Sequence, residues 1–266
     1  MRWVTFDQGN SSLKWCLWEA LDGGRALVHS RGCAGEGPLE PALEELREEL
    51  ASAPAEAALY SGVTDELQAA AVRDAWGAIS SGAPWREPAP AIASECDDPE
   101  AVGRDRRFAA QAAFSLKGPA LVVDAGTALT VDAVGEGPTF LGGAIAPGPE
   151  LLADALDRGG AKLFKVTPDS AARALGRSTE EALVAGVSVG FRGAAAALVL
   201  EVSREAGLED APVVLTGGAR SLLQGGALFG ERATHGFADL VHLGLLLCEG
   251  VEAQLEEEPW PSSSES

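Results

Sequence analysis

Two stretches of the chain, residues 3–15 and 122–132, repeat one pattern. Each is a run of β-branched or aromatic residues that ends in Asp-x-Gly-(Asn/Thr) and is followed by hydroxyl residues and a second strand-like run. The pattern predicts a β-hairpin whose tip places one carboxylate, Asp7 or Asp124, beside a glycine that admits a ligand to the backbone. Backbone N–H groups and hydroxyls at such a tip can bind phosphate oxygens, while the carboxylate faces a cation. Two such tips therefore predict a nucleotide held between two related domains.

The charge of the chain narrows the classes of partner. It carries 40 acidic and 20 basic residues among 266, a formal net charge of −20. This balance disfavours nucleic acid, because binding to a phosphate backbone rests on basic patches. The acidic excess fits either an ordinary solvated surface or adaptation to high salt, and the sequence leaves both open.

The apolar runs and the cysteines bear on location. The longest apolar run, residues 240–248, is interrupted by His242 and is too short to span a membrane, and no signal-peptide core follows the N-terminus. The four cysteines form no CxxC pair, which disfavours a structural zinc site and a disulfide framework. We therefore expect a cytoplasmic protein without a membrane partner.

The first half of the chain predicts a ββ(β)αβα order. Residues 3–6 and 14–19 form the first hairpin, and residues 26–30 a third strand. Residues 39–51 form a helix with leucines at helical spacing, 57–61 a strand and 65–75 a second helix. This order suits an RNase H-like half-domain, with helices packed on a mixed sheet.

The second half predicts a related arrangement after an irregular, proline-rich connector at residues 76–99. The expected elements are a helix at 105–116, a hairpin at 120–133, a glycine-rich segment at 138–149, a helix at 150–158, an alanine-rich helix at 179–206 broken or crossed near its glycines, and a strand at 213–216. We expect domains at 1–115 and 116–255, and a frayed acidic tail at 256–266.

Six motifs occur along the chain in an order that resembles the type III pantothenate kinases. They are Asp7-x-Gly9-Asn10-Ser11-x-x-Lys14, Gly103-Arg104-Asp105-Arg106, Asp124-x-Gly126-Thr127-x-x-Thr130-x-Asp132, Leu141-Gly142-Gly143-Ala144-Ile145-Ala146-Pro147-Gly148, Ser178-Thr179-x-Glu181-Ala182 and Thr216-Gly217-Gly218. That family belongs to the acetate and sugar kinase, Hsp70 and actin superfamily. The resemblance implies an α/β fold of two RNase H-like (actin-like ATPase) half-domains, with mixed sheets flanked by helices. It also implies phosphorylation of pantothenate by ATP to 4'-phosphopantothenate, the first step of coenzyme A biosynthesis.

The resemblance assigns an ATP site to the first tip and to one threonine of the second. Its residues are Asp7, Gln8, Gly9, Asn10, Ser11, Ser12, Leu13, Lys14 and Thr127. Asp7 would also lie near the Mg²⁺ of ATP, and Asp124 would help to bind a monovalent cation, K⁺ or NH₄⁺. The alternatives are that Asp7 only bonds the amides of its own turn and that Lys14 is an ordinary exposed lysine.

The resemblance places the acceptor site around the Gly-x-Asp-Arg box. Asp105 would be the general base that takes the proton of the acceptor hydroxyl. Its alternative is a helix cap or first-turn acid. Arg106 would bind the carboxylate of pantothenate, with Gly103 and Arg104 in the same box.

Two further expectations complete the acceptor site. Apart from the place of Arg104 in the Gly-x-Asp-Arg box, we expect the side chains of Arg104 and Arg107 to face solvent or acidic neighbours. Cys96 stands where the family often has a tyrosine, so its contact with pantothenate would lack the tyrosine hydroxyl.

Two threonines have both a structural and a functional interpretation. Thr179 either caps its helix or contacts pantothenate across the interface of a homodimer, and both can hold if Ser178 is the cap. Thr216, with the two glycines after it, either lies against adenine or forms a plain turn.

Two other functions stay open from the sequence. One is a kinase of the same superfamily that acts on another small alcohol or a sugar, although the length argues against the large sugar kinases. The other is a non-catalytic regulatory relative. The presence of Asp7, Asp105 and Asp124 argues against it.

Overall fold

The computed structural model describes residues 1–20, 25–35, 37–224 and 228–258. The chain forms two compact units. Unit 1 comprises Met1–Ile92, Asp97–Ala112 and Asp239–Glu256, and unit 2 comprises Ala93–Cys96, Ala113–Ala238 and Glu257–Ser266. The continuous domains expected from the sequence, 1–115 and 116–255, stay a prediction, and most of the tail expected at 256–266 lies outside the described residues.

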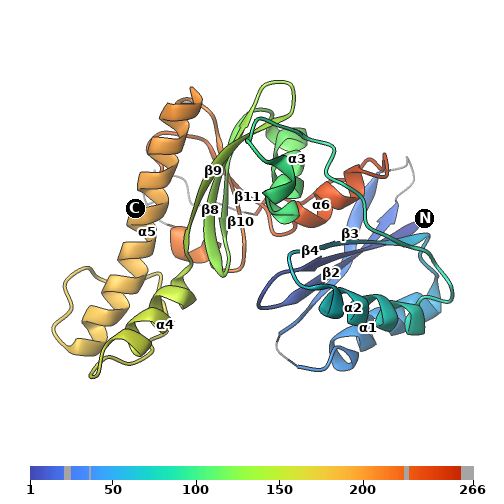
Figure 1. Ribbon diagram of the computed structural model, residues 1–266, viewed down its shortest axis with the longest axis horizontal. Helices are drawn as coiled ribbons and strands as arrows, with labels where there is room; N and C mark the ends of the chain where they lie inside the picture. Colours follow the sequence, from blue (N-terminus) through green and yellow to red (C-terminus); the bar gives the residue numbers. More distant parts are fainter. Residues whose placement is uncertain (21–24, 36, 225–227, 259–266) are drawn as a thin grey trace. The chain divides into compact units, whose positions relative to one another are not determined.

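Unit 1 is built on a five-stranded mixed sheet (Figure 1). Its strands are β1 (Arg2–Gln8), β2 (Leu13–Ala20), β3 (Ala26–Ala34), β4 (Ala57–Gly62) and β5 (Trp85–Arg86), in the order β3-β2-β1-β4-β5. The β1–β2 and β2–β3 pairs are antiparallel, whereas β4 runs parallel to β1 and β5 parallel to β4. The predicted first hairpin is thus present, and β1 pairs on its other side with a parallel strand.

Helices α1 (Glu40–Ser52) and α2 (Glu66–Ile79) cover one face of this sheet (Figure 1). The predicted leucine stripe of α1 is confirmed, because Leu43, Leu46 and Leu50 are buried in one cluster with Trp76 of α2. Each such buried leucine stabilises the fold by about 2 kcal/mol relative to exposure. The α2 helix begins where Asp65 accepts a hydrogen bond from the Gln68 amide.

Unit 2 repeats the topology of unit 1. Its strands are β6 (Ala93–Ser94), β7 (Ala120–Ala125), β8 (Ala128–Gly135), β9 (Thr139–Pro147), β10 (Val213–Thr216) and β11 (Thr234–Gly236), in the order β11-β10-β7-β8-β9-β6. The run β9-β8-β7-β10-β11 matches β3-β2-β1-β4-β5 strand for strand, including its two antiparallel and two parallel pairs. The two predicted tips therefore sit on equivalent strands of two related sheets.

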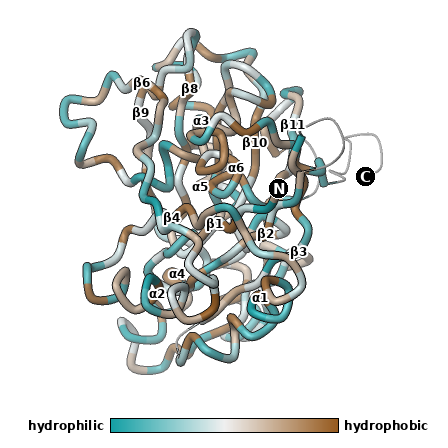
Figure 2. The backbone as a smooth tube through the Cα atoms, turned by 90° about the vertical axis from the view of Figure 1, so that its right-hand side faces the viewer, coloured by the Kyte–Doolittle hydropathy of each residue, from teal (hydrophilic) through white to brown (hydrophobic). Residues whose placement is uncertain are grey.

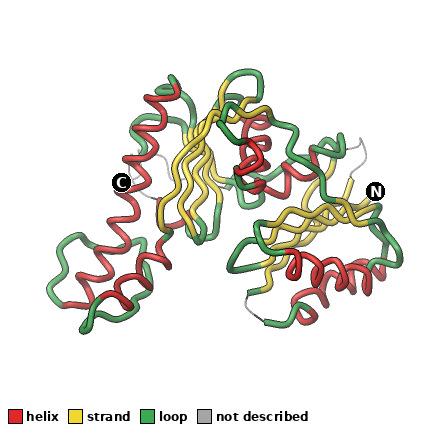
Figure 3. Tube along the Cα trace, viewed as in Figure 1, coloured by secondary structure: helices red, strands yellow, loops and turns green. Residues whose placement is uncertain are grey.

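The long helix α5 (Thr179–Ala206) packs on the unit 2 sheet. It is unbroken over 28 residues (Figure 3), so the break expected near its glycines is wrong. Phe191, Ala195 and Val199 are buried in a cluster that also holds Leu121 and Leu129 of the sheet. Packing against the sheet compensates for the low helix propensity of three internal glycines.

The α5 helix is also long and apolar enough to cross a membrane, by length and composition only. The expectation that no apolar run reaches that length is therefore wrong. About 39% of its most apolar window is buried. Phe191, Ala195 and Val199 pack on the unit 2 sheet, whereas Leu183 and Val187 pack in a separate cluster with Ala153 of α4. A core helix of a domain passes the same test, so this feature is weak evidence for a membrane.

Several elements were missed in the sequence. The expected connector at 76–99 contains the end of α2, β5 and β6, and is followed by a short 3₁₀ helix, Pro99–Ala101. The glycine-rich segment at 138–149 is mostly strand β9 (Thr139–Pro147). Its glycines fit a strand here because the backbone of the neighbouring strand comes very close to Gly143. The remaining helices are α3 (Arg104–Lys117), α4 (Pro149–Gly159), a 3₁₀ helix at Arg220–Leu223 and α6 (Leu240–Leu247).

The α6 helix returns the chain to unit 1 and packs against β1 and β4. It is among the more hydrophobic segments of the chain (Figure 2), with all seven residues from Leu240 to Leu246 buried. Side chains alternate along a strand, so Phe6 joins the cluster under α1 and α2 while Thr5 faces α6. The sheet of unit 1 is consequently covered on both faces.

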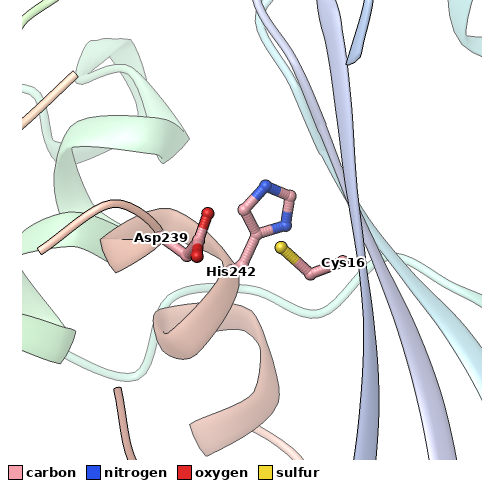
Figure 4. A group of neighbouring side chains, drawn as sticks. All are labelled: Cys16, Asp239 and His242. Carbon is pink, nitrogen blue, oxygen red and sulfur yellow. The ribbon is translucent and has the colours of Figure 1, made fainter. Parts of the chain in front are cut away.

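A buried polar network fixes α6 on the β1–β2 hairpin. Thr5 Oγ1 lies 2.9 Å from His242 Nδ1 and accepts a hydrogen bond of the same length from Trp18 Nε1. Cys16 and Asp239 lie beside His242, and all three side chains are buried (Figure 4). Asp239 pairs with Arg31 at 3.0 Å, and burial, with the nearby Asp239 carboxylate, raises the pKa of the Cys16 thiol. These contacts engage Nδ1 of His242, whereas its buried Nε2 has no hydrogen-bond partner within the described residues.

Burial lowers the pKa of His242 from 6.5 to about 3, helped by the cationic Lys14 and Arg31. The folded imidazole is therefore neutral, whereas the unfolded one binds a proton below about pH 6.5. Stability that depends on the neutral ring is present above that pH and is lost as the pH falls towards 3. We expect the free energy of unfolding to drop by about 1 kcal/mol more between pH 7 and 5.5 in the wild type than in His242→Gln. Urea denaturation at both pH values measures this, and equal drops would contradict it.

Candidate active site

The tip of the first hairpin lines a pocket in unit 1. Residues 9–12 connect β1 to β2, and the turn closes through a hydrogen bond of 3.0 Å from the Gly9 amide to the Ser12 carbonyl. The pocket, of about 260 Å³, is lined by Gln8, Gly9, Asn10, Ser11, Ser12, Leu13, Gly35, Gly37, Leu39, Gln68 and Ala71. Six of the eight residues predicted for the first ATP loop thus surround one hollow.

The carboxylate of this tip lies one residue before the end of β1. Asp7 is in register with Lys14 of β2 and with Ser61 of β4. Lys14 is exposed, whereas Ser61 is fully buried, and its hydroxyl has no hydrogen-bond partner within the described residues. Asp7 thus stands between an exposed cation and a buried hydroxyl.

The last residue of β1 is held by a side chain that sequence reasoning did not identify. The Tyr60 hydroxyl donates a hydrogen bond of 2.6 Å to Oε1 of Gln8. Gln8 is in register with Gly62 at the end of β4. A Cβ on Gly62 would lie 2.1 Å from the Tyr60 hydroxyl oxygen, so only glycine leaves room for this contact.

The second tip has the same construction in unit 2. Asp124 lies one residue before the end of β7, in register with Thr216 of the parallel strand β10. Thr216-Gly217 therefore corresponds to Ser61-Gly62, a repeat visible in the sequence as a hydroxyl residue and a glycine after each parallel strand. The Gly217 backbone, at φ +91°, passes so close that a Cβ would lie 2.3 Å from Asp124 Oδ1.

Two further contacts shape this second tip. The Gly126 amide donates to the Ala128 carbonyl at 2.9 Å, which closes the turn, and the Gly148 amide donates to the Thr127 carbonyl at 3.0 Å. Thr127 is exposed. The segment after Gly217 is tied down through the Ala219 amide, which donates to the Ala125 carbonyl at 2.8 Å.

The Gly-x-Asp-Arg box opens helix α3 in unit 1. Asp105 lies in the first turn, and its Oδ1 accepts a hydrogen bond of 2.9 Å from the Arg106 amide. A Cβ on Gly103 would lie 2.5 Å from the same oxygen, so only a glycine at position 103 leaves room for the carboxylate. Asp105 is a partly exposed acid in the first turn of α3, as the alternative of a first-turn acid predicts. Its partial exposure also leaves it accessible to a substrate.

The two flanking arginines are partly buried and donate to backbone carbonyls, so the expectation that they face solvent is wrong, although Arg104 does lie near the acidic Glu87. The Arg104 guanidinium donates to the Pro88 carbonyl and lies 5.9 Å from the centre of the Phe108 ring. Arg107 donates to the carbonyls of Ile92 and Pro99, at 3.1 and 3.4 Å. Backbone carbonyls in the connector need donors, and these two side chains supply them.

The remaining candidate residues lie in unit 2. Ser178 caps α5, because its Oγ accepts from the Glu181 amide at 3.1 Å, and Glu181 reaches back to the Arg177 amide at 2.6 Å. Thr179 is the first residue of the helix and is exposed, so it is not the cap. Cys96 is partly exposed, and its sulfur would lie 3.9 Å from a Cβ on Gly142 of β9.

Comparison with known families gives one match over most of the chain. Residues 3–201 match the sequence model of the family described as type III pantothenate kinase. A type III pantothenate kinase of Akkermansia muciniphila is 37% identical over 154 residues, which cover 58% of this chain and 62% of the relative. One of Streptomyces avermitilis is 41% identical over 134 residues, 49% of this chain and 51% of the relative. The chain thus spans between half and two thirds of the length of these relatives.

Solved structures establish the fold. A proposed Baf family transcriptional activator from Campylobacter jejuni superposes with a TM-score of 0.55 at 19% identity, over 93% of this chain and 97% of the other. The activator of 2-hydroxyisocaproyl-CoA dehydratase from Clostridium difficile, with bound ADPNP, gives 0.51 at 12% identity, over 95% and 93%. With two mixed sheets flanked by helices, these likenesses confirm the predicted actin-like fold.

The close approach of Gly217 to Asp124 gives a test of the second tip. Gly217→Ala would place a methyl group against Asp124 and the Ala125 carbonyl at a positive φ, and we expect it to cost about 1–3 kcal/mol of stability. The neighbouring Gly218→Ala is the matched control, because its added Cβ meets no atom within 4 Å, and its cost should stay within about 0.5 kcal/mol. Urea denaturation compares the two, and equal losses would contradict the role of Gly217.

Proposed function

Because the chain belongs to the type III pantothenate kinase family, we propose that it transfers the terminal phosphoryl group of ATP to the hydroxyl of pantothenate. The product would be 4'-phosphopantothenate, which enters coenzyme A biosynthesis. The observation that carries the proposal is the pocket of unit 1, whose wall is the Gly9–Ser12 turn with its amides and hydroxyls. Turnover of ATP with a panel of small alcohols, pantothenate included, tests it, and turnover with another alcohol alone would overturn it.

The phosphates of ATP would be bound by the first tip. Gly9, Asn10, Ser11 and Ser12 offer backbone amides, hydroxyls and a side-chain amide around one pocket, which are the donors that phosphate oxygens need. Lys14, which is exposed on β2 directly after the pocket residue Leu13, is our candidate for an additional cation. In unit 2, the exposed Thr127 is our candidate for a further ATP contact.

The two carboxylate tips would serve two cations. Magnesium needs one or two carboxylates and keeps several waters, so Asp7, which directly precedes the pocket residue Gln8 and is in register with Ser61, is our candidate for the Mg²⁺ that accompanies ATP. Asp124 lies among the backbone carbonyls near Gly217 and Gly126, a hard oxygen environment that fits K⁺ or NH₄⁺. Magnesium would neutralise phosphate charge in the reaction. Titration of K⁺ into Na⁺-free assays tests the second assignment, which full activity without a monovalent ion would overturn.

The acceptor hydroxyl would lose its proton to Asp105. Phosphoryl transfer depends on orienting the hydroxyl in line with the phosphate, and a carboxylate within hydrogen-bond reach takes the proton late. The Arg106 amide holds the Asp105 carboxylate, and Gly103 leaves room for it. Arg106 would bind the carboxylate of pantothenate, with Thr179 and Cys96 as further candidate contacts. The contacts of Arg104 with the connector favour a role in holding the box rather than in binding substrate.

A homodimer through α5 would complete the acceptor site. The side of α5 away from the sheet carries exposed small residues: Ala182, Gly186, Gly190, Gly193 and Ala197. A Cβ on any of its three glycines meets no atom within 4 Å, so these glycines are not used for packing inside the described chain. A second helix could approach this face closely. Under this proposal Thr179, at the start of the same helix, belongs to the partner's site.

The reaction is proposed to take place in the cytoplasm. Cys16, Cys33, Cys96 and Cys248 are all free thiols, as expected in a reducing compartment. Fractionation of cells that express the tagged protein tests the location, and recovery with the membrane fraction would overturn it.

Asp105→Asn should cut turnover by roughly 10²–10⁴-fold while leaving the fold intact, the usual range for loss of a general base. Asp157→Asn, at an exposed position on α4, is the control for the loss of one surface charge. Single-turnover kinetics with saturating ATP and pantothenate measure the effect. A rate above about a third of the wild-type value would remove Asp105 from this role.

Gly190→Trp should separate the dimer, because the indole would fill the space that a second helix needs. Sedimentation should show the mass fall from twice the 27.3 kDa of the chain to the monomer value, with a parallel loss of turnover. Gly77→Trp is the matched control, since Gly77 is an exposed helical glycine of α2 with no atom near its Cβ. A fully active wild-type monomer at assay concentration would contradict the dimer.

A further inference from the structure

The only tyrosine of the chain lies directly behind the unit 1 pocket that is proposed to hold the phosphates of ATP. Tyr60 is on β4, in register with Phe6 of the neighbouring strand β1, and is 4% exposed. Gln8 lies two residues after Phe6, on the same face of β1, because side chains alternate along a strand. The Tyr60 hydroxyl, at 2.6 Å from Gln8 Oε1, therefore reaches the pocket wall from the core side.

The tyrosine ring is held on one face and at its hydroxyl end. The Trp85 ring lies over it, with the ring centres 4.9 Å apart, and Trp85 is itself held by a hydrogen bond of 2.7 Å to Glu87. At the far end, the bare backbone of Gly62 lies against the hydroxyl. Burial raises the pKa of Tyr60, so the phenol keeps its proton at neutral pH and stays a donor.

This contact decides what Gln8 can offer a ligand. With its oxygen accepting from Tyr60, the amide has two N–H donors left for other partners. Gln8 lines the pocket together with Asn10, Ser11 and Ser12. An aliphatic side chain at this position would provide no donor, whereas an amide held in one orientation provides a fixed one at little entropic cost.

We propose that the Gln8 side-chain amide donates a hydrogen bond to a phosphate oxygen of ATP, and that Tyr60 is the positioning residue that orients it. The inference rests on the proposed function, in which this pocket holds the phosphates. Tyr60 itself touches no substrate. Its effect on the enzyme passes through Gln8 alone, which makes the two residues energetically coupled.

A double-mutant cycle measures this coupling. The affinity for a non-hydrolysable ATP analogue is measured by calorimetry in the absence of pantothenate. In Gln8→Leu this affinity should fall about 10-fold, the effect expected for the loss of a hydrogen bond to a charged acceptor. Tyr60→Phe should weaken it about 3- to 10-fold, and the double variant no more than Gln8→Leu alone. In steady state the KM for ATP should rise in the same proportion, with kcat and the KM for pantothenate within about twofold of wild type.

Two further variants separate positioning from stability. Thr5→Val removes another buried hydroxyl of unit 1, which accepts from Trp18, and should lower stability without changing the affinity for the analogue. Gln8→Glu keeps the acceptor for Tyr60 but replaces the donors by a negative charge, so it should weaken binding at least as much as Gln8→Leu. It tests the amide donor even if Tyr60→Phe does not fold.

The outcomes distinguish this inference from the proposed function. Additive effects of the two substitutions, an unchanged affinity in Tyr60→Phe, or normal binding in Gln8→Glu would each overturn the inference while the wild type still phosphorylates pantothenate. A wild-type protein that binds no ATP analogue would overturn both. Coupled losses, with the Thr5→Val control unaffected, support it.

Discussion

Parallel pairing of the central strand of each sheet organises both units. β1 pairs with β4 and β7 with β10, so each carboxylate stands opposite a hydroxyl residue, Asp7 opposite Ser61 and Asp124 opposite Thr216. A glycine follows each hydroxyl residue, and the backbone there comes close to its neighbours. Since parallel strands need a crossover connection, this pairing also dictates that helices separate β1 from β4 and β7 from β10. The hairpin tips depend on that frame for their position.

The elements predicted well from the sequence are those with a strong local signal. The α1 stripe, the two hairpins and β10 each have a clear period or turn, and their bounds agree with the structure to within a few residues. The repeat of Asp-x-Gly in both halves also led to the correct expectation of two related sheets. Such signals are local, and local propensity and tertiary packing agree in these segments.

The elements that were missed are those whose structure is decided by distant contacts. The β9 segment is glycine-rich, which predicts a loop, yet eight of its residues pair with β8. At Gly143 the backbone of β8 comes so close that only a glycine leaves room for it. The α6 segment is short, and its place on β1 depends on Thr5 and His242, which are 237 residues apart. In the site, Tyr60 carries no motif at all. Its contact with Gln8 exists only because parallel pairing brings position 60 beside position 6.

The parallel strand pairs also explain why the two hairpin tips can differ in length and sequence while they keep equivalent positions on their sheets. The first tip spans four residues and the second spans two, yet both leave equivalent strands at the residue after the aspartate. Chemistry at the tip is then free to differ, with a polar Gln8 supported from the core in one unit and the small Ala125 in the other. Because Gln8 draws its orientation from β4 rather than from its own turn, the donor at this tip depends on the sheet's register. The pairing of β1 with β4 thus constrains the orientation of the Gln8 side chain, which the hairpin alone would not do.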